Sequence, residues 1–194
     1  MNPVVHLAST NPGKLSELAD LLGSALDLRL PSALVAPEET GQTFAENALL
    51  KARALSVRLP GAALADDSGL EVDALGGRPG VHSSRYAASD EARIARLLEE
   101  LGPAPGRAAR FRCAIALVFP DGREIVVEGR CEGEIAFAPR GRHGFGYDPV
   151  FVPTGEHRTF AEMSSAEKAV RSHRAEAARQ LLEEMARQGD EGLK

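Results

Sequence analysis

We predict an α/β fold built on a mixed β-sheet with flanking helices, and two observations lead to it. In the first half of the chain, short β-type runs alternate with stretches whose apolar residues recur at helical spacing. Further along, residues 110–119 and 124–137 read as two long strands, and the turn Pro120-Asp121-Gly122 between them is a hairpin signal. Alternating elements followed by an antiparallel pair favour a mixed sheet.

The first elements are a strand, a tight turn and a helix. Residues 4–8 form a short β-type run. Asn11 is a good N-cap and Pro12 favours the first helical position. Leucines then recur at helical spacing, which predicts a helix that runs to residue 23. Residues 27–35 are expected to be a second strand region.

The middle of the chain continues the alternation. Thr43 and Glu46 form a capping-box pattern, which predicts a helix from residue 43 to about Leu59. A strand is expected at 62–65, and residues 66–69 are expected to leave it. A further helix is predicted to start at Ser89-Asp90-Glu91 and to run to about Leu101.

The last third begins with a glycine-rich loop at 141–153 that leads into a strand. Ser164 and Glu167 form a second capping-box pattern. We expect the helix that it opens to run without a break to about Gln188.

The bulk composition describes an ordinary globular protein. The 194 residues, with no independent linker, favour one domain over residues 1–194. A net charge of −5 argues against long nucleic acid as a binding partner, because such binding relies on neutralising phosphates with positive charge. The two cysteines, Cys113 and Cys131, are expected to be buried reduced thiols. With no signal-peptide pattern and no apolar run near the ~20 residues of a membrane span, we expect a cytoplasmic protein without membrane contact.

Two adjacent carboxylates, Asp66 and Asp67, follow the apolar run at 62–65. An unpaired buried carboxylate is costly, so the pair is either a polar turn or a chemical site. If the strand continues through both residues, their side chains point to opposite faces. One can then bind Mg²⁺ or orient a water, while the other is satisfied by neighbouring groups.

Three further segments could bind a nucleotide. The turn "STNPGK" at 9–14 joins a strand to a helix start, which attracts phosphate, but it lacks the glycine and hydroxyl positions of a Walker A loop. The loop "HGFGYDP" at 143–149 places two aromatic rings among glycines, either to stack a base or to pack inward. A basic stretch at 168–174 is either a solvated helix face or a ligand-binding one.

The chain closely resembles the inosine triphosphatase-like, or Ham1-like, family of purine nucleoside triphosphate pyrophosphatases. The resemblance covers nearly the whole chain in the family's order. It is carried by LASTNPGK, TFAENALLKA, LADDSGLEVDALGGRPGVHSSRYA, GFGYDPVF and AEMSSAEKAVRSHR. It implies an elongated fold with two lobes around a central substrate cleft, and a homodimer. It also implies Mg²⁺-dependent hydrolysis of ITP, dITP and XTP to the monophosphate and pyrophosphate, which clears damaged bases from the nucleotide pool.

The resemblance also implies roles for individual residues. Asp67 matches the catalytic acid–base position and is also associated with the metal. Glu39 best matches the other metal carboxylate, with Glu38 as the less favoured register. The residues that match substrate contacts are Ser9, Thr10, Asn11, Pro12, Gly13, Lys14, Ser68, Phe145, Gly146, Tyr147, Asp148, Lys168, His173 and Arg174.

Within that set, residues 9–14 match the triphosphate turn, and residues 145–148 match the base loop, where Phe145 stacks on the purine. His173 and Arg174 match the pair that reads the oxygen-bearing edge of the base. Thr10 departs from the glycine of many relatives.

Two rival functions remain open at this point. One is a nucleotide pyrophosphatase of the Maf-like type, which acts on other nucleotides. The other is a nucleotide-binding regulatory protein without catalysis, against which Asp67, Glu39 and Lys14 argue. The role of Asp66 also remains open, either structural or as a second metal ligand.

Overall fold

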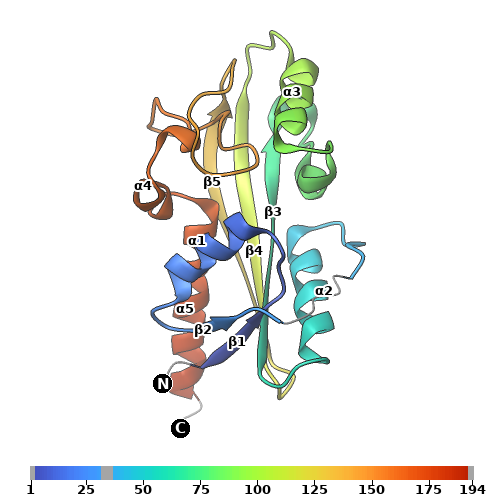
Figure 1. Cartoon of the computed structure of the whole chain (residues 1–194), viewed down its shortest axis with the longest axis vertical. Coiled ribbons are helices and arrows are strands. Elements are labelled where there is room, and N and C mark those ends of the chain that lie inside the picture. The colour runs from blue at the N-terminus through green and yellow to red at the C-terminus, as the bar shows by residue number, and fades with distance from the viewer. Residues whose placement is uncertain (1–2, 32–36, 192–194) are drawn as a thin grey trace. The chain divides into compact units, whose positions relative to one another are not determined.

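The computed structural model describes residues 3–31 and 37–191 and contains a six-stranded sheet in the order β2-β1-β3-β4-β5-β6 (Figure 1). The strands are β1 (Val4–Leu7), β2 (Asp27–Arg29), β3 (Ala62–Val72), β4 (Ala108–Val118), β5 (Glu124–Ile135) and β6 (Phe151–Pro153). β1 pairs in parallel with β2 and with β3, whereas β6 runs antiparallel to β5. The sheet is therefore mixed, as the sequence predicts.

The helices connect these strands. They are α1 (Pro12–Leu22), α2 (Phe44–Ser56), α3 (Asp90–Leu101), α4 (Ser165–Ala169) and α5 (His173–Glu191), with short 3-10 turns at Asp73–Leu75, Gly80–Arg85 and Phe160–Glu162. Both predicted capping boxes are present, at Thr43–Glu46 and at Ser164–Glu167. Asn11 caps α1, as expected.

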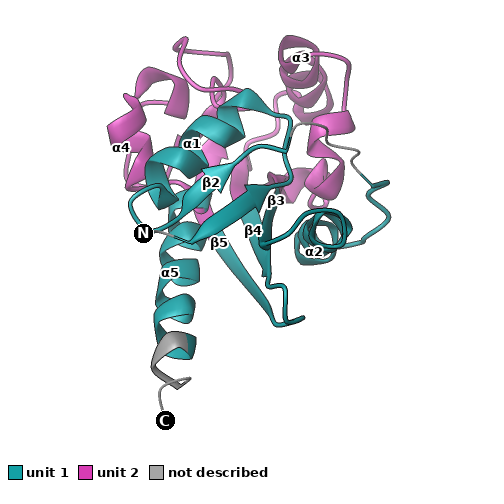
Figure 2. Cartoon of the chain, turned by 60° about the horizontal axis from the view of Figure 1, so that its bottom comes forward, with its two compact units in different colours: residues 1–67, 113–129, 174–194 teal, residues 68–112, 130–173 magenta. Residues whose placement is uncertain are grey.

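The chain divides into two compact units (Figure 2). Unit 1 comprises residues 1–67, 113–129 and 174–194, and unit 2 comprises residues 68–112 and 130–173. β3, β4 and β5 each contribute residues to both units. The expectation of a single domain over residues 1–194 stays a prediction.

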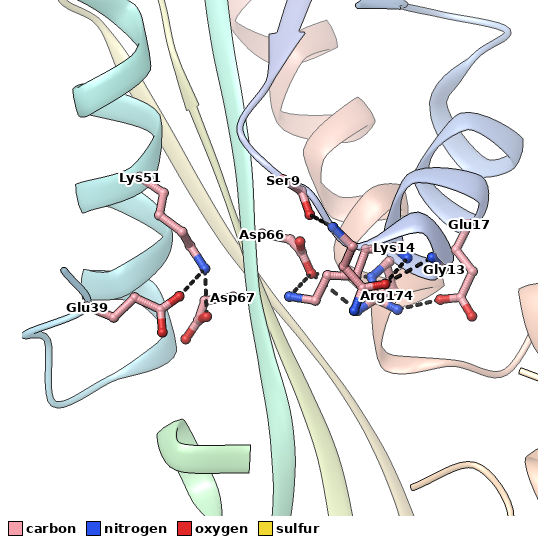
Figure 3. A network of polar contacts seen from close by, with 10 residues as sticks. Ser9, Gly13, Lys14, Glu17, Glu39, Lys51, Asp66, Asp67 and Arg174 are labelled. Carbon is pink, nitrogen blue, oxygen red and sulfur yellow. Dashed lines mark hydrogen bonds and ion pairs between the residues drawn. The ribbon is translucent and has the colours of Figure 1, made fainter. Parts of the chain in front are cut away.

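The core of unit 1 packs α1 and α5 against the strands. Leu18 and Leu22 of α1 are fully buried together with Leu64 of β3 and Leu181 of α5. α2 lies on the other side of β3 (Figure 3). Strand β3 is therefore covered on both faces, which agrees with its nearly continuous apolar and buried sequence.

The core of unit 2 is built around aromatic rings. The Phe111 ring centroid lies 4.6 Å from that of Phe151, which lies 5.3 Å from that of Phe160. Leu97 of α3 and Leu70 of β3 are fully buried in the same cluster. These ring contacts pack β4, β6 and the 3-10 turn Phe160–Glu162 against one another.

Several predicted boundaries shift by one to three residues, as at the end of α2, and three elements differ more. β3 does not end at residue 65 but continues to Val72, because cations distant in sequence compensate the carboxylates of Asp66 and Asp67. The predicted helix 164–188 is broken between α4 and α5 by residues 170–172. The predicted strand 27–35 is observed as Asp27–Arg29, and residues 32–36 lie outside the described residues.

Two other expectations concern the cysteines and the membrane. Cys113 and Cys131 are free and buried, as predicted, and burial raises the pKa of Cys113 to about 12. Among the described residues, no helix has both the length and the apolar character that crossing a membrane demands.

Candidate active site

Asp66 and Asp67 lie side by side on β3, and their carboxylates point to opposite faces of the strand (Figure 3). Both are buried, with 1% and 6% of their surface exposed. The alternation of side chains along a continuous strand produces this arrangement, as the sequence predicts. Each carboxylate has its own cationic partners, Lys14 and Arg174 for Asp66 and Lys51 for Asp67, and these three residues belong to unit 1.

Asp66 forms a buried ion cluster with α1 and α5. Its Oδ2 lies 3.1 Å from Lys14 Nζ and 3.2 Å from Arg174 Nη2. Arg174 also pairs with Glu17 through Nη1, and only 1% of its surface is exposed. Burial alone would raise the pKa of Asp66, but Lys14 and Arg174 outweigh it and hold that pKa far below its usual value.

These contacts bear directly on two sequence expectations. They place Asp66 between Lys14 and Arg174, which favours the structural alternative, and the role of Asp66 stays a prediction. They also engage the Arg174 guanidinium, so reading a base edge through that residue would require new contacts. The predicted base-reading role of Arg174 stays a prediction.

The turn before α1 presents a mixture of capped and exposed groups. Asn11 Oδ1 accepts hydrogen bonds from the Gly13 and Lys14 amides at 2.9 and 3.2 Å. Ser9 Oγ accepts one from the Asn11 amide at 3.3 Å. Thr10 and Pro12 are exposed. The Asn11 side chain thus occupies amides that would otherwise attract a phosphate, while Lys14 supplies the positive charge of this turn.

On the opposite face, Asp67 shares one lysine with Glu39. Lys51 Nζ of α2 donates to Asp67 Oδ1 at 2.7 Å and to Glu39 Oε1 at 2.8 Å (Figure 3). Burial raises the pKa of Asp67 more than the Lys51 ammonium lowers it. Burial would lower the pKa of Lys51, but the carboxylates of Asp67 and Asp66 together raise it. Lys51 is therefore a fixed ammonium between two carboxylates.

The loop that carries Glu39 is tethered to α2 by Asn47. The Gly41 amide donates to Asn47 Oδ1 at 2.8 Å, and Asn47 Nδ2 donates to the Gly41 carbonyl at 3.3 Å. Asn47 is fully buried. A Cβ atom at residue 41 would come within 2.6 Å of Asn47 Oδ1, so glycine permits this close approach. Asn47 and Lys51 lie one turn apart on the helix, and both serve to position Glu39.

The donor atoms on this face suit a hard cation. Asp67 Oδ2 is buried and has no hydrogen-bond partner among residues 3–31 and 37–191. A buried carboxylate oxygen left in this way is a ready ligand for a divalent ion. No group of three or more His, Cys, Asp or Glu side chains among the described residues could by itself hold a metal. The carboxylates fit an ion such as Mg²⁺ that takes its remaining ligands from water and substrate phosphate.

In unit 2, the loop at 144–148 folds around one buried carboxylate. Asp148 Oδ2 accepts from the Phe145 amide at 2.9 Å and from Lys168 Nζ at 2.5 Å. The same ammonium lies 4.9 Å from the centre of the half-buried Phe145 ring. Gly144 has φ +74°, and a Cβ there would come within 2.0 Å of Asp148 Oδ2. Only glycine fits beside this carboxylate.

The two aromatic residues of this loop have different environments. Tyr147 is buried in the core of unit 2, and its hydroxyl donates to the Ser83 carbonyl at 3.1 Å. The Gly146 amide donates to Asp90 Oδ2 of α3 at 2.6 Å. The inward-packing alternative thus applies to Tyr147, whereas Phe145 remains partly exposed. Asp90 is a loop contact that sequence reasoning missed, because only the fold brings α3 beside this loop.

His173 and Ser68 are the remaining predicted site residues of unit 2. The His173 ring stacks on Phe111 at 4.6 Å between centroids and has 3% of its surface exposed. Ser68 is half-buried on β3, directly after Asp67. The predicted residues thus form two groups. Unit 1 holds residues 9–14, Glu39, Asp67 and Arg174, and unit 2 holds Ser68, residues 145–148, Lys168 and His173.

The Asp66 cluster predicts a pH-dependent loss of stability. We expect Asp66→Asn to lower the free energy of unfolding by about 3 kcal/mol at neutral pH, because it removes the buried negative charge that Lys14 and Arg174 share. The pKa of Asp66 is lower in the folded than in the unfolded chain, so its contribution is present above the unfolded value of about 3.9. That contribution is lost as pH falls below this value.

Urea unfolding measured from about pH 7 down to about pH 2.5 tests this expectation. The difference in free energy of unfolding between wild type and Asp66→Asn should stay constant down to about pH 4 and narrow below it. Asp27→Asn is the matched control, because Asp27 forms an exposed pair with Arg29. It should change little at any pH. A difference for Asp66→Asn that stays constant below about pH 4 would contradict the ion-pair account.

Comparison with known proteins finds matches that cover most of the chain. A model of the Ham1 family matches residues 5–184. A protein of Synechococcus sp. (strain CC9311), named dITP/XTP pyrophosphatase, is 51% identical over 91% of this chain and 86% of its own length. A protein of the same name from Geobacillus kaustophilus (strain HTA426) is 51% identical over 93% of both chains.

Solved structures show the same fold. The Ham1 protein of Staphylococcus aureus superposes with a TM-score of 0.83 at 40% identity, over 98% of this chain and 100% of its own. A nucleoside-triphosphatase / dITP/XTP pyrophosphatase from Mycobacterium abscessus superposes with a TM-score of 0.73 at 46% identity, over 92% and 97% of the two chains. With a family model that covers nearly its whole length and relatives identical at about half of the aligned positions, the chain belongs to the Ham1 family.

Proposed function

We propose that this chain is a dITP/XTP pyrophosphatase that hydrolyses dITP, ITP and XTP to the nucleoside monophosphate and pyrophosphate with Mg²⁺. The names of its relatives support the activity and the substrate class. The observation that carries the proposal is Asp67, a buried carboxylate whose Oδ1 accepts from Lys51 and whose Oδ2 has no hydrogen-bond partner in the described part of the chain. Lys14 supplies a cation for the triphosphate from the other face of β3.

Glu39 and Asp67 are the residues that would hold Mg²⁺. When bound, the ion supplies positive charge that offsets the phosphate oxygens and stabilises the pyrophosphate leaving group. A carboxylate has two oxygens, so Asp67 can ligate through one of them and accept a proton at the other. Glu38 is exposed in the structure, whereas Glu39 reaches Lys51, and this difference favours Glu39 as the ligand.

The chemical step places a water against the α-phosphorus, and Asp67 takes its proton. Burial raises the pKa of Asp67, and a carboxylate with a raised pKa is a stronger base. The negative charge that builds on the departing pyrophosphate needs fixed cations. Lys14 is suited to this task, because Asp66 holds its ammonium in one position at 3.1 Å. Residues 9–13 would contact the phosphates beside it.

The base would be recognised by the residues of unit 2. Phe145 offers a partly exposed ring for stacking, and Lys168 and Asp148 fix the backbone around it. Hypoxanthine and xanthine carry a carbonyl at position 6, where adenine carries an amino group. A donor such as His173 or Arg174 facing that carbonyl would reject adenine, because the donor would be left unpaired. Ser68, Gly146 and Tyr147 complete the proposed set of contacts.

The substrate panel is the direct test of this function. Purified protein should release pyrophosphate from dITP and XTP in the presence of Mg²⁺, far faster than from dATP or without the metal. Asp67→Asn should lower kcat by on the order of a thousandfold or more while the fold is retained, since the base is lost. Wild-type turnover in that variant, or release of orthophosphate instead of pyrophosphate, would contradict the proposal.

Adjacent glutamates allow a matched test of the metal ligand. Glu39→Gln should raise the Mg²⁺ concentration needed for half-maximal activity by on the order of tenfold or more. Glu38→Gln makes the same chemical change one residue away and should leave that concentration unchanged. The reverse result would assign the ligand to Glu38.

The proposal includes a homodimer, which rests on the family resemblance. Sedimentation velocity of the purified chain should therefore give a single species of twice the chain mass of 20.6 kDa. A monomer at micromolar concentration would contradict this part of the proposal and leave the assigned activity untouched.

A further inference from the structure

Lys51 contacts the same two carboxylates that the proposed function assigns to the metal. Its Nζ lies 2.8 Å from Glu39 Oε1 and 2.7 Å from Asp67 Oδ1. The two carboxylates carry two negative charges, and the ammonium neutralises one of them. A divalent cation on the same pair must either displace this ammonium or bind beside it against its repulsion.

The position of Lys51 is held firmly by its surroundings. Only 9% of its surface is exposed, and it lies within α2, whose capping box at Thr43 fixes the helix start. Asn47, one turn earlier, ties the Glu39 loop to the same helix through Gly41. The Glu39 loop, α2 and β3 are therefore linked to one another, and this linkage holds both carboxylates against the Lys51 ammonium.

A plain structural ion pair would need only one carboxylate. Here one ammonium contacts both carboxylates, and among the described residues Asp67 keeps a buried oxygen without a hydrogen bond. That oxygen is available to a metal even with Lys51 in place. A negatively charged triphosphate offers Lys51 a new partner, which lowers the free energy needed to move it away from the carboxylates.

We propose that Lys51 is a built-in counter-ion that weakens divalent-metal binding to Glu39 and Asp67 until a triphosphate arrives. The inference rests on the proposed function, because it takes this pair as the metal ligands. Its consequence is regulatory. The nucleotide-free protein binds metal weakly, and metal and triphosphate load together, each strengthening the binding of the other.

The test is metal binding by the whole nucleotide-free protein, with Mn²⁺ as the spectroscopic probe. Electron paramagnetic resonance of free Mn²⁺ gives the dissociation constant without any turnover. Lys51→Gln should bind Mn²⁺ on the order of tenfold or more tightly than wild type, because one positive charge has left the two ligands. An unchanged or weaker affinity would overturn the proposal.

Three control variants sharpen this measurement. Arg53→Gln removes the same charge from the same helix, where Arg53 forms an exposed pair with Glu124, and should leave the Mn²⁺ affinity at the wild-type value. Lys51→Arg keeps the charge and should do the same. The double variant Lys51→Gln with Glu39→Gln should lose the gained affinity. A gain that survives in the double variant would place the metal elsewhere and overturn the proposal.

A measurement on wild type covers the case in which Lys51→Gln does not fold. The chain has four lysines, so ¹⁵N-lysine labelling gives a sparse spectrum in which Lys51→Arg identifies one ammonium signal. Titration with Mg²⁺ should shift the Lys51 signal in step with metal binding, ahead of that of Lys168, which pairs with Asp148. A Lys51 signal that does not move while metal binds would overturn the proposal.

The two levels of inference fail separately. If wild type hydrolyses dITP but Lys51→Gln shows no gain in Mn²⁺ affinity, only the counter-ion role of Lys51 is wrong. If wild type hydrolyses none of the proposed substrates, the proposed function is wrong, whatever the metal affinities are.

Discussion

The rest of the site depends on one constraint: the negative charges of two adjacent buried carboxylates on β3 must be compensated by nearby cations. A strand turns neighbouring side chains to opposite faces, so Asp66 and Asp67 cannot share one partner. Each needs its own cation, because an unpaired buried carboxylate is too costly to keep. α1 and α5 bring Lys14 and Arg174 to one face, and α2 brings Lys51 to the other. The arrangement of helices around β3 in unit 1 therefore follows from a charge requirement as much as from apolar packing.

The same constraint separates two chemical tasks. On the Asp66 face, Lys14 and Arg174 both contact Asp66, and Arg174 also contacts Glu17, which anchors the turn before α1. On the Asp67 face, one ammonium contacts both carboxylates, and Asp67 Oδ2 has no hydrogen-bond partner among the described residues. A carboxylate oxygen of this kind is what a metal-dependent site needs. Unit 2 contains a similar buried ion pair, in which Lys168 contacts Asp148 beside the loop around Phe145.

Local signals in the sequence predicted the local parts of this structure. The capping boxes at Thr43 and Ser164 and the N-cap at Asn11 satisfy helix starts through nearby side chains, so they are visible in a short window. The opposite facing of Asp66 and Asp67 followed from the period of a strand. The continuation of β3 through both residues could not be predicted in this way, because Arg174 lies 108 residues from Asp66. The burial of Lys51 and Asn47 was hidden for the same reason, since polar residues one turn apart on a helix ordinarily face water. The break between α4 and α5, at residues 170–172, contains no proline or glycine from which it could have been predicted.

The central claim is that the two carboxylates of β3 have different functions: Asp67 binds the metal, and Asp66 pairs with the cations of α1 and α5. A crystal structure with Mn²⁺ and a non-hydrolysable dITP analogue tests it most directly, because anomalous scattering locates the metal independently of the model. The account predicts a Mn²⁺ peak bound by Asp67 and Glu39, with Asp66 still paired to Lys14 and Arg174. A peak bound by Asp66, or one that touches neither Asp67 nor Glu39, would contradict it.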